Sequence, residues 1–315
     1  MKEGISLNTA ASRAGVIAIG SNSTRMLTAN LDSTLSKPVR ARQETRLFLA
    51  LNEGHSIAPE TAIRLIDAVQ LLQQQALDAG AQKVYLTATS ALRDSRDIVS
   101  LKATLLQRTG LDLRVLTGNE EAVYSFLGAA YSYESGQTLG VVDIGGGSTE
   151  IAWGTKRALH RALSLQLGAS RLYAGFPIKD LDGLAPAFAE AEHGLGEAID
   201  ELEHLPGRWL LVGGTGTALI GLLKGRMMTA DLQEDQPFTR EQAFATLHML
   251  AGLSLQERAE LSGMTPGREN ILPTGLTILC RLMTRLNIEE MRVTTRNNCD
   301  GFLYKLAAEQ NKEEG

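Results

Sequence analysis

Apolar and polar positions follow two different periods along the first third of the chain. Residues 14–31 show an apolar strand, a small polar turn and a second apolar strand. A helical rhythm follows over residues 59–80, with Pro59 in the first turn and Gly80 as its terminator. Further elements follow in the order strand, helix and strand, over residues 83–89, 97–110 and 111–118. Alternating strands and helices predict a sheet covered by helices.

The second part of the chain begins with the same kind of pattern. Three consecutive strands are expected over residues 138–144, 149–154 and 158–168, followed by a helix over 184–205 that Gly194 and Gly196 weaken. The remaining pattern indicates a strand over 208–214, a helix over 215–225, a mostly helical stretch over 239–287, a strand over 291–295 and a closing helix from 301. A chain of 315 residues suits two domains. We place the first domain at 1–120 and the second at 121–301, with helix 302–315 packing back on the first.

An internal repeat relates the two parts. When the chain is shifted by 125 residues, "AIGSNSTRML" lies on "DIGGGSTEIA". The identical pairs are Ile19/Ile144, Gly20/Gly145, Ser23/Ser148 and Thr24/Thr149. Both copies lie between two expected strands. The repeat therefore predicts two related domains that face each other across a cleft, each opening with a strand, a phosphate-binding turn and a strand.

The glycine turn at residues 145–148 can be compared with three phosphate-binding designs. A P-loop is excluded because no Lys follows the glycines at the required spacing. The dinucleotide-binding fingerprint needs a third glycine where Glu150 stands, and a helix where residues 149–154 alternate like a strand. A tight β-hairpin remains, in which the glycines supply positive φ angles and their N–H groups form an anion-binding nest. The alternative is a hairpin whose glycines serve only for turning.

Composition narrows the classes of partner. The net charge is −5, and no block of five or six basic residues occurs, which argues against nucleic-acid binding. A small polyanion remains possible as a ligand, since backbone N–H groups and a few arginines can bind it in an acidic protein. No stretch approaches the ~20 apolar residues of a membrane span. The polar N-terminal residues 1–15 lack a signal-peptide core, so we expect no membrane partner and a cytoplasmic location.

Six motifs together give a specific resemblance. "IGSNSTRML", "TATSALRDS", "GNEEA", "DIGGGSTEI", "LSLQLGASRL" and "LLVGGTGTAL" occur in the order and spacing of the exopolyphosphatase/guanosine-pentaphosphate phosphohydrolase family. The chain resembles its short, two-domain members. The resemblance implies an α/β fold with two actin-like (ribonuclease H-like) domains of the sugar kinase/heat-shock-protein-70/actin superfamily around a central cleft. It also implies Mg²⁺-dependent release of orthophosphate from the end of inorganic polyphosphate, with guanosine pentaphosphate as the related substrate, and allows a homodimer.

The resemblance assigns roles to three carboxylates. Glu121 matches the family's catalytic base, whereas the plain alternative is that Glu120 and Glu121 only favour the helix dipole in a first turn. Asp143 and Glu150 match acids that handle the metal and position the water. Paired acids beside a polyphosphate repel it unless a divalent cation intervenes, so the pair implies Mg²⁺.

Phosphate contacts are expected mainly from the two turns and from one arginine. The candidate phosphate-binding residues are Ser21, Asn22, Ser23, Arg93, Gly145, Gly146, Gly147, Ser148, Gly214 and Thr215. Arg93 suits a bidentate phosphate clamp, and its alternative is a surface ion pair with Asp94 or Asp97. Residues 213–219 resemble the superfamily's second phosphate or nucleoside loop, which opens a helix. Arg171 and Arg268 match family arginines less distinctively.

Three positions depart from the family pattern. Ala18 stands where the family usually has Asp, and the internal repeat pairs it with Asp143. Phe48 stands where glycine is common, and "RNNCDG" loses a basic residue and gains Asp300. Ala18 supports an alternative function, a phosphate- or nucleotide-binding regulator that has lost turnover. A sugar or acetate kinase of the same fold is a further alternative, which "GNEEA" does not support.

Overall fold

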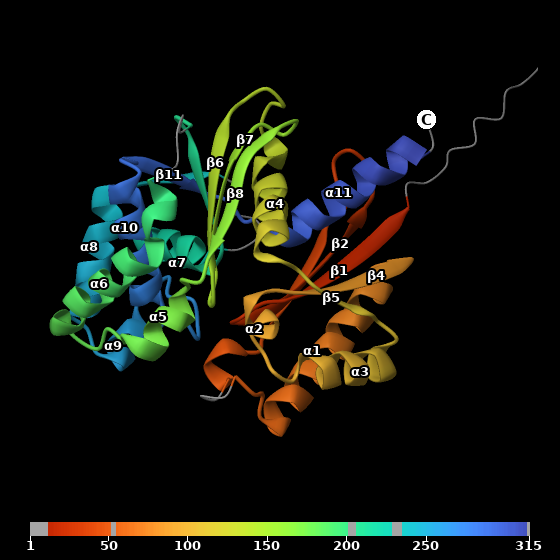
Figure 1. The fold of residues 1–315 in the computed structure, drawn as a ribbon, viewed down its shortest axis with the longest axis horizontal. Coiled ribbons are helices and arrows are strands. Elements are labelled where there is room, and N and C mark those ends of the chain that lie inside the picture. The colour runs from red at the N-terminus through yellow and green to blue at the C-terminus, as the bar shows by residue number, and fades with distance from the viewer. Residues whose placement is uncertain (1–11, 52–54, 201–205, 229–234, 314–315) are drawn as a thin grey trace, which may run out of the picture.

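The chain folds into two α/β lobes, each built on one mixed sheet (Figure 1). The computed structural model describes residues 12–51, 55–200, 206–228 and 235–313. Most of the polar N-terminal stretch and the last five residues of the predicted helix 184–205 therefore lie outside the described residues.

The first lobe contains the sheet order β3-β2-β1-β4-β5. Its strands are β1 (Arg13–Ile19), β2 (Ser23–Asn30), β3 (Val39–Glu44), β4 (Lys83–Ala88) and β5 (Leu113–Val115). Strands β1, β2 and β3 are antiparallel, whereas β4 runs parallel to β1 and β5 runs parallel to β4. The helices of this lobe are α1 (Pro59–Asp78), α2 (Ser90–Arg93) and α3 (Ile98–Thr109). Pro59 opens α1 and Gly110 ends α3 in the left-handed conformation, as the sequence predicts.

The second lobe repeats this order and adds one edge strand. Its strands are β6 (Leu139–Ile144), β7 (Thr149–Gly154), β8 (Leu159–Leu165), β9 (Trp209–Val212), β10 (Gln236–Thr239) and β11 (Glu290–Val293). The order β8-β7-β6-β9-β11 matches β3-β2-β1-β4-β5, and β10 extends the sheet beyond β11. The antiparallel and parallel pairings also match. The predicted pair of related, ribonuclease H-like domains is thus confirmed.

Helices cover the second sheet on the side away from the first lobe (Figure 1). They are α5 (Ala169–Gly175), α6 (Leu184–Leu195), α7 (Gly214–Lys224), α8 (Arg240–Ala251), α9 (Leu255–Glu260) and α10 (Leu272–Arg285). The predicted helix 184–205 is too long, because Gly196 takes a φ of +56° and ends α6 at Leu195. Short 3₁₀ turns occur at Phe48–Ala50, Ala130–Ser132, Leu181–Gly183 and Glu197–Ile199.

Two helices lie between the sheets, α4 (Gly118–Ala129) and α11 (Asn298–Glu313) (Figure 1). Helix α4 packs on the second sheet through an apolar cluster that includes Phe126. Helix α11 packs on the first sheet through a cluster that includes Leu303. The two helices also touch, since a Cβ on Gly301 would lie 1.8 Å from the carbonyl oxygen of Tyr124. The sequence boundary at 120/121 falls in the first turn of α4.

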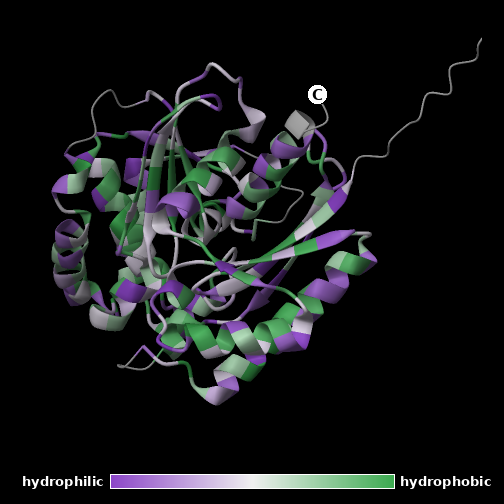
Figure 2. Cartoon of the chain, turned by 45° about the vertical axis from the view of Figure 1, so that its right-hand side comes forward, coloured by the Kyte–Doolittle hydropathy of each residue, from purple (hydrophilic) through white to green (hydrophobic). Residues whose placement is uncertain are grey.

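Hydrophobic residues gather along the central strands and on the helix faces that cover them (Figure 2). Among the described residues, no helix is long and apolar enough to span a bilayer.

Candidate functional site

The two turns of the sequence repeat meet between the lobes. The β1–β2 turn is closed by a hydrogen bond from Gly20 N to Ser23 O of 3.1 Å. The β6–β7 turn is closed by the equivalent bond from Gly145 N to Ser148 O, at 3.0 Å. The repeat found in the sequence is therefore also a repeat of backbone geometry.

The reason for the three glycines is different from the one predicted. None of Gly145, Gly146 and Gly147 adopts the left-handed backbone, so the expectation of positive φ angles is wrong. Instead, a Cβ on Gly146 would lie 2.7 Å from the Cβ of Ser21 in the other lobe. A Cβ on Gly147 would lie 2.4 Å from the Oγ of Ser90. Gly146 and Gly147 are needed because the lobes leave no room for a side chain there, whereas a Cβ on Gly145 would meet the carbonyl oxygen of Ser148 in its own turn at 3.0 Å.

A cavity of about 70 Å³ lies at this junction. Its walls include the predicted residues Ser21, Asn22, Ser23, Glu121, Asp143, Gly145, Gly146, Ser148 and Gly214, together with Ala18, Arg25 and Arg268. The predicted residues Arg93, Gly147, Glu150 and Thr215 are not in this wall. Arg93 and Glu150 lie behind this wall. Arg93 donates a hydrogen bond to Glu121, and Glu150 is the cross-strand neighbour of Asp143.

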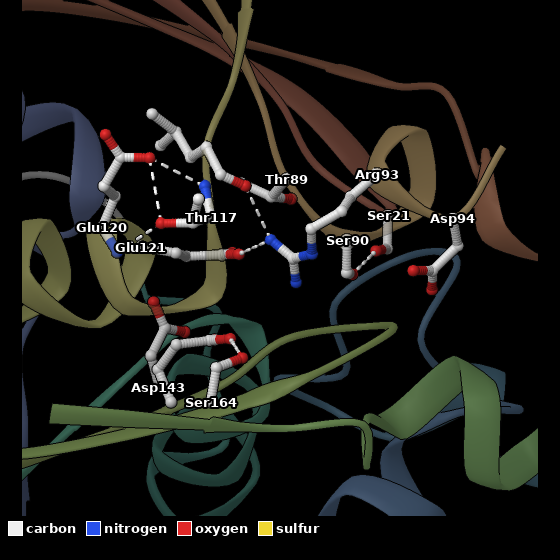
Figure 3. A network of polar contacts seen from close by, with 12 residues as sticks. Ser21, Thr89, Ser90, Arg93, Asp94, Thr117, Glu120, Glu121, Asp143 and Ser164 are labelled. Atoms are coloured by element: carbon white, nitrogen blue, oxygen red, sulfur yellow. Dashed lines mark hydrogen bonds and ion pairs between the residues drawn. The ribbon is translucent and has the colours of Figure 1, made fainter. Parts of the chain in front are cut away.

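The adjacent residues Glu120 and Glu121 have different roles (Figure 3). Glu120 forms a capping box with Thr117, accepting a 2.8 Å hydrogen bond from its backbone N–H. Its other carboxylate oxygen pairs with Arg114 at 2.5 Å. Glu121 is 6% exposed and faces the cavity. The explanation that a glutamate favours the helix dipole therefore fits Glu120. It does not explain why Glu121 is buried.

Arg93 is the cation next to Glu121. Its Nη1 donates to Glu121 Oε2 at 3.3 Å and to the carbonyl oxygen of Leu116 at 2.9 Å (Figure 3). Burial raises the pKa of Glu121 to about 7, with a contribution from the charge of Asp143, while Arg93 opposes the shift. A carboxyl group with this pKa exchanges its proton near neutral pH. Arg93 therefore forms its ion pair with Glu121 and not with Asp94 or Asp97, which was the alternative.

Asp143 and Glu150 are cross-strand partners in the β6–β7 hairpin. Ser125 Oγ donates to Asp143 Oδ2 at 2.6 Å, and Ser164 Oγ donates to Glu150 Oε1 at 2.7 Å. Burial raises the pKa of Asp143, and burial together with the charges of Glu121 and Asp143 raises that of Glu150. The three carboxylates resist being ionised together, which favours a cation beside them.

In the first hairpin a neutral and a basic residue stand at the positions of the two acids. Ala18 pairs with Arg25 across β1–β2, just as Asp143 pairs with Glu150 across β6–β7. Arg25 lines the cavity but was not singled out from the sequence. The 125-residue shift places it on Glu150 and so contained the signal that would have found it.

Arg268 lies against the beginning of α7. A Cβ on Gly214 would lie 1.7 Å from its Nη2, so only glycine leaves room for the guanidinium. Burial and the nearby Arg42 and Arg25 lower the pKa of Arg268 to about 9. A buried cation next to a helix N-terminus is unfavourable unless an anion joins them.

Several buried polar atoms without a hydrogen-bond partner lie in the wall of this cavity, on Asn22 and Arg268, or close behind it. Within the described part of the chain, the buried side-chain atoms that lack a hydrogen-bond partner include Asn22 Oδ1 and Nδ2, Arg93 Nη2, Glu150 Oε2, Ser170 Oγ, Thr215 Oγ1 and Arg268 Nε. Buried polar groups are normally paired, so this concentration indicates the place of a polar ligand.

Arg171 serves a different purpose, because it connects the lobes. Its Nε donates to Gly147 O at 2.7 Å, and its Nη2 pairs with Asp94 of the first lobe. The guanidinium also stacks 4.9 Å from the centre of the Phe48 ring. Phe48, one of the departures from the family pattern, therefore packs at the contact between the lobes.

The comparison with known proteins agrees with this geometry. The profile of the Ppx/GppA phosphatase family matches residues 29–310. The chain belongs to the Ppx/GppA phosphatase family. A guanosine-5'-triphosphate,3'-diphosphate pyrophosphatase of Vibrio campbellii is 28% identical over 298 residues, covering 93% of this chain and 59% of the relative. One from Vibrio vulnificus is 27% identical and covers 95% and 60%, so the chain spans about three fifths of these Ppx/GppA relatives.

Solved Ppx/GppA structures share the whole fold. An exopolyphosphatase-like protein superposes with a TM-score of 0.87 at 22% identity, covering 95% of this chain and 99% of the other. An exopolyphosphatase from Cytophaga hutchinsonii gives 0.84 at 20% identity, with coverages of 95% and 98%. The Aquifex aeolicus family member gives 0.78 at 21% identity, with coverages of 95% and 99%. At these identities the likeness concerns the fold.

Proposed function

We propose that this chain hydrolyses the terminal phosphoanhydride of inorganic polyphosphate, or of guanosine pentaphosphate, in a Mg²⁺-dependent reaction that releases orthophosphate. The observation that carries the proposal is a small cavity between the lobes that is lined by the buried carboxylate of Glu121, by Arg25 and Arg268, and by the unpaired side-chain amide of Asn22. Family membership and the names of the Vibrio relatives support the same reaction class.

Glu121 acts as the base. Its carboxylate faces the small cavity, and a pKa of about 7 suits the acceptance of a proton from water at neutral pH. The water oxygen bonds to the terminal phosphorus, its proton passes to Glu121, and the bridging P–O bond breaks with its electrons on the leaving phosphate. Arg93 holds Glu121 in place from behind.

The terminal phosphoryl group lies between the two turns. The N–H groups of residues 21–23 and 146–148 and the hydroxyls of Ser21 and Ser148 provide its hydrogen bonds, while the N–H of Gly145 closes the turn. Arg25 and Arg268 neutralise its charge from the first and second lobes. Arg93, predicted as a phosphate clamp, donates a hydrogen bond to Glu121 through Nη1. Its Nη2 has no hydrogen-bond partner among the described residues.

The carboxylates fit a divalent cation. Asp143 and Glu150 are neighbours, their pKa values are raised, and Glu150 Oε2 has no partner among the described residues. Mg²⁺ is commonly bound by one or two carboxylates together with substrate phosphates and waters. When bound, it neutralises phosphate oxygens and the repulsion among the acids.

The test is orthophosphate release from long-chain polyphosphate and from guanosine pentaphosphate by the purified protein, with and without Mg²⁺. We expect Mg²⁺-dependent release from at least one substrate. Tight binding of both without release would refute hydrolysis and favour the regulator, which the methyl group of Ala18 in the cavity wall also favours.

A further inference from the structure

A second, larger cavity opens beside the phosphate cavity. Its volume is about 700 Å³, and it shares Arg25 and Gly213 with the smaller cavity of about 70 Å³. Strands β2 and β3 of the first lobe form one wall, and residues 294–297 of the second lobe form another. The small cavity suits one phosphoryl group, so the larger one is the place for the rest of the substrate.

Arginines dominate the charge of this second cavity. Arg25, Arg40, Arg42 and Arg296 line it, with Asp300 as the carboxylate among its lining residues. Arg42 pairs with the partly exposed Glu44 at 2.9 Å. No hydrogen bond or ion pair of Arg25 is found in the described part of the chain, and this arginine stands nearest the phosphate cavity.

Asp300 engages two of these arginines. It is 1% exposed and accepts hydrogen bonds from Arg40 Nη1 at 3.0 Å and Arg40 Nη2 at 2.5 Å. Arg296 Nη1 lies 4.0 Å from the same carboxylate, and its guanidinium stacks 4.2 Å from the centre of the Tyr131 ring. The backbone N–H of Asn297 adds a 3.0 Å bond to Asp300, so the carboxylate is fixed in position.

Asp300 therefore offsets part of the positive charge that the arginines bring to the second cavity. A bidentate arginine–carboxylate pair has its donors directed at the carboxylate rather than at a ligand. Beyond Arg25 the cavity also presents the apolar side chains of Leu27, Leu35 and Met228. A polyphosphate chain carries negative charge along its whole length, whereas guanosine pentaphosphate combines its phosphates with an uncharged nucleoside that needs no arginine beside it.

We infer that Asp300 is a specificity-determining residue, which holds Arg40 and Arg296 away from the substrate and thereby favours a nucleotide over a polyphosphate chain in the second cavity. The inference rests on the proposed function. It does not concern the reacting groups, so it can be tested separately from turnover.

The experiment uses two substitutions that break the same ion pair and change its charge in opposite directions. Asp300→Asn keeps the acceptor for Asn297 N–H and leaves one more net positive charge, whereas Arg40→Gln removes one. Dissociation constants for long-chain polyphosphate and guanosine pentaphosphate are measured by calorimetry, with each substitution placed in a Glu121→Gln background to prevent hydrolysis. The Glu121→Gln protein is the reference.

We expect Asp300→Asn to shift the affinity ratio towards polyphosphate by about three- to tenfold, and Arg40→Gln to shift it towards the nucleotide. The shift should shrink as salt is raised. An unchanged ratio, a shift in the same direction in both variants, or no binding of either ligand would overturn the inference. If the affinity ratios shift in opposite directions but the wild-type protein releases no orthophosphate, the inference about Asp300 stands. Only the proposed hydrolysis is then refuted.

Discussion

Replacing Glu121 by Gln tests the base and its electrostatic tuning in one protein. The side chain keeps its shape but can no longer accept a proton. Loss of a positioned general base lowers kcat by roughly 10²- to 10⁴-fold, measured as orthophosphate release at pH 8. In the wild-type protein, activity should rise with pH through about 7, where Glu121 ionises, and this limb should be missing from the residual activity of the variant.

The same substitution should change how stability depends on pH. The folded-state pKa of Glu121 is raised from the ordinary value of 4.5 to about 7, so its stabilising contribution is complete below 4.5 and is lost as pH rises through 7. One pKa unit corresponds to ~1.4 kcal/mol, so the loss is about 3 kcal/mol. Gln has no such loss. The difference in free energy of unfolding, Glu121→Gln minus wild type, should therefore be up to about 3 kcal/mol larger at pH 8 than at pH 5, which means that the variant is relatively more stable at pH 8.

The neighbouring Glu120 provides the matched control. Glu120→Gln retains the capping box, because Gln also serves at this position, and loses only the exposed pair with Arg114. We expect near wild-type kcat and unfolding free energy. Retention of kcat by Glu121→Gln would refute the base assignment. Equal relative stabilities of that variant at pH 5 and pH 8, from urea unfolding, would refute the argument from burial.

Three further changes probe the rest of the site. Gly146→Ala should lower kcat by at least tenfold, because the added methyl meets Ser21 at 2.7 Å and separates the lobes; unchanged kinetics would contradict this. Arg93→Met should raise the pH of half-maximal activity, since the cation that stabilises ionised Glu121 is lost, and a pH profile identical to wild type would contradict it. Ala18→Asp should tighten Mg²⁺ binding measured by calorimetry at low salt, because the new carboxylate adds a ligand to the cavity wall; weaker or unaltered binding would show that position 18 does not face the cation.

The fold was predictable because its signals are local. The strand–turn–strand pattern locates β1 and β2, Pro59 and Gly110 locate the start of α1 and the end of α3, and the 125-residue shift locates the counterparts of β1 and β2 in the second lobe. Strand β3 was missed because its residues are half-buried or exposed and show no apolar alternation. The end of α6 was misplaced because Gly196 was read as a weak helical position rather than as a positive-φ terminator.

The sequence motifs identified most of the residues that line the small cavity, although they missed Arg25 and did not give the reasons for burial. Motifs identify which residues meet, but burial depends on packing between distant elements. Glu120 and Glu121 look alike in sequence, and only the packing of α4 on the second sheet separates an exposed cap from a buried carboxylate. The glycines at 146 and 147 were explained by local backbone geometry, whereas their cause is the other lobe.

The two hairpins divide the chemistry by charge. Each presents one cross-strand pair to the cavity region, Asp143 with Glu150 in the second lobe and Ala18 with Arg25 in the first. Two acidic pairs would place four carboxylates around a polyanion, whereas an alanine–arginine pair leaves one lobe acidic and the other basic. Under the proposed function, the acidic hairpin then handles cation and water while the basic one holds the phosphate. Under this proposal the reaction requires both hairpins at once, so we expect the close contact of the lobes at Gly146 to be part of the catalytic arrangement.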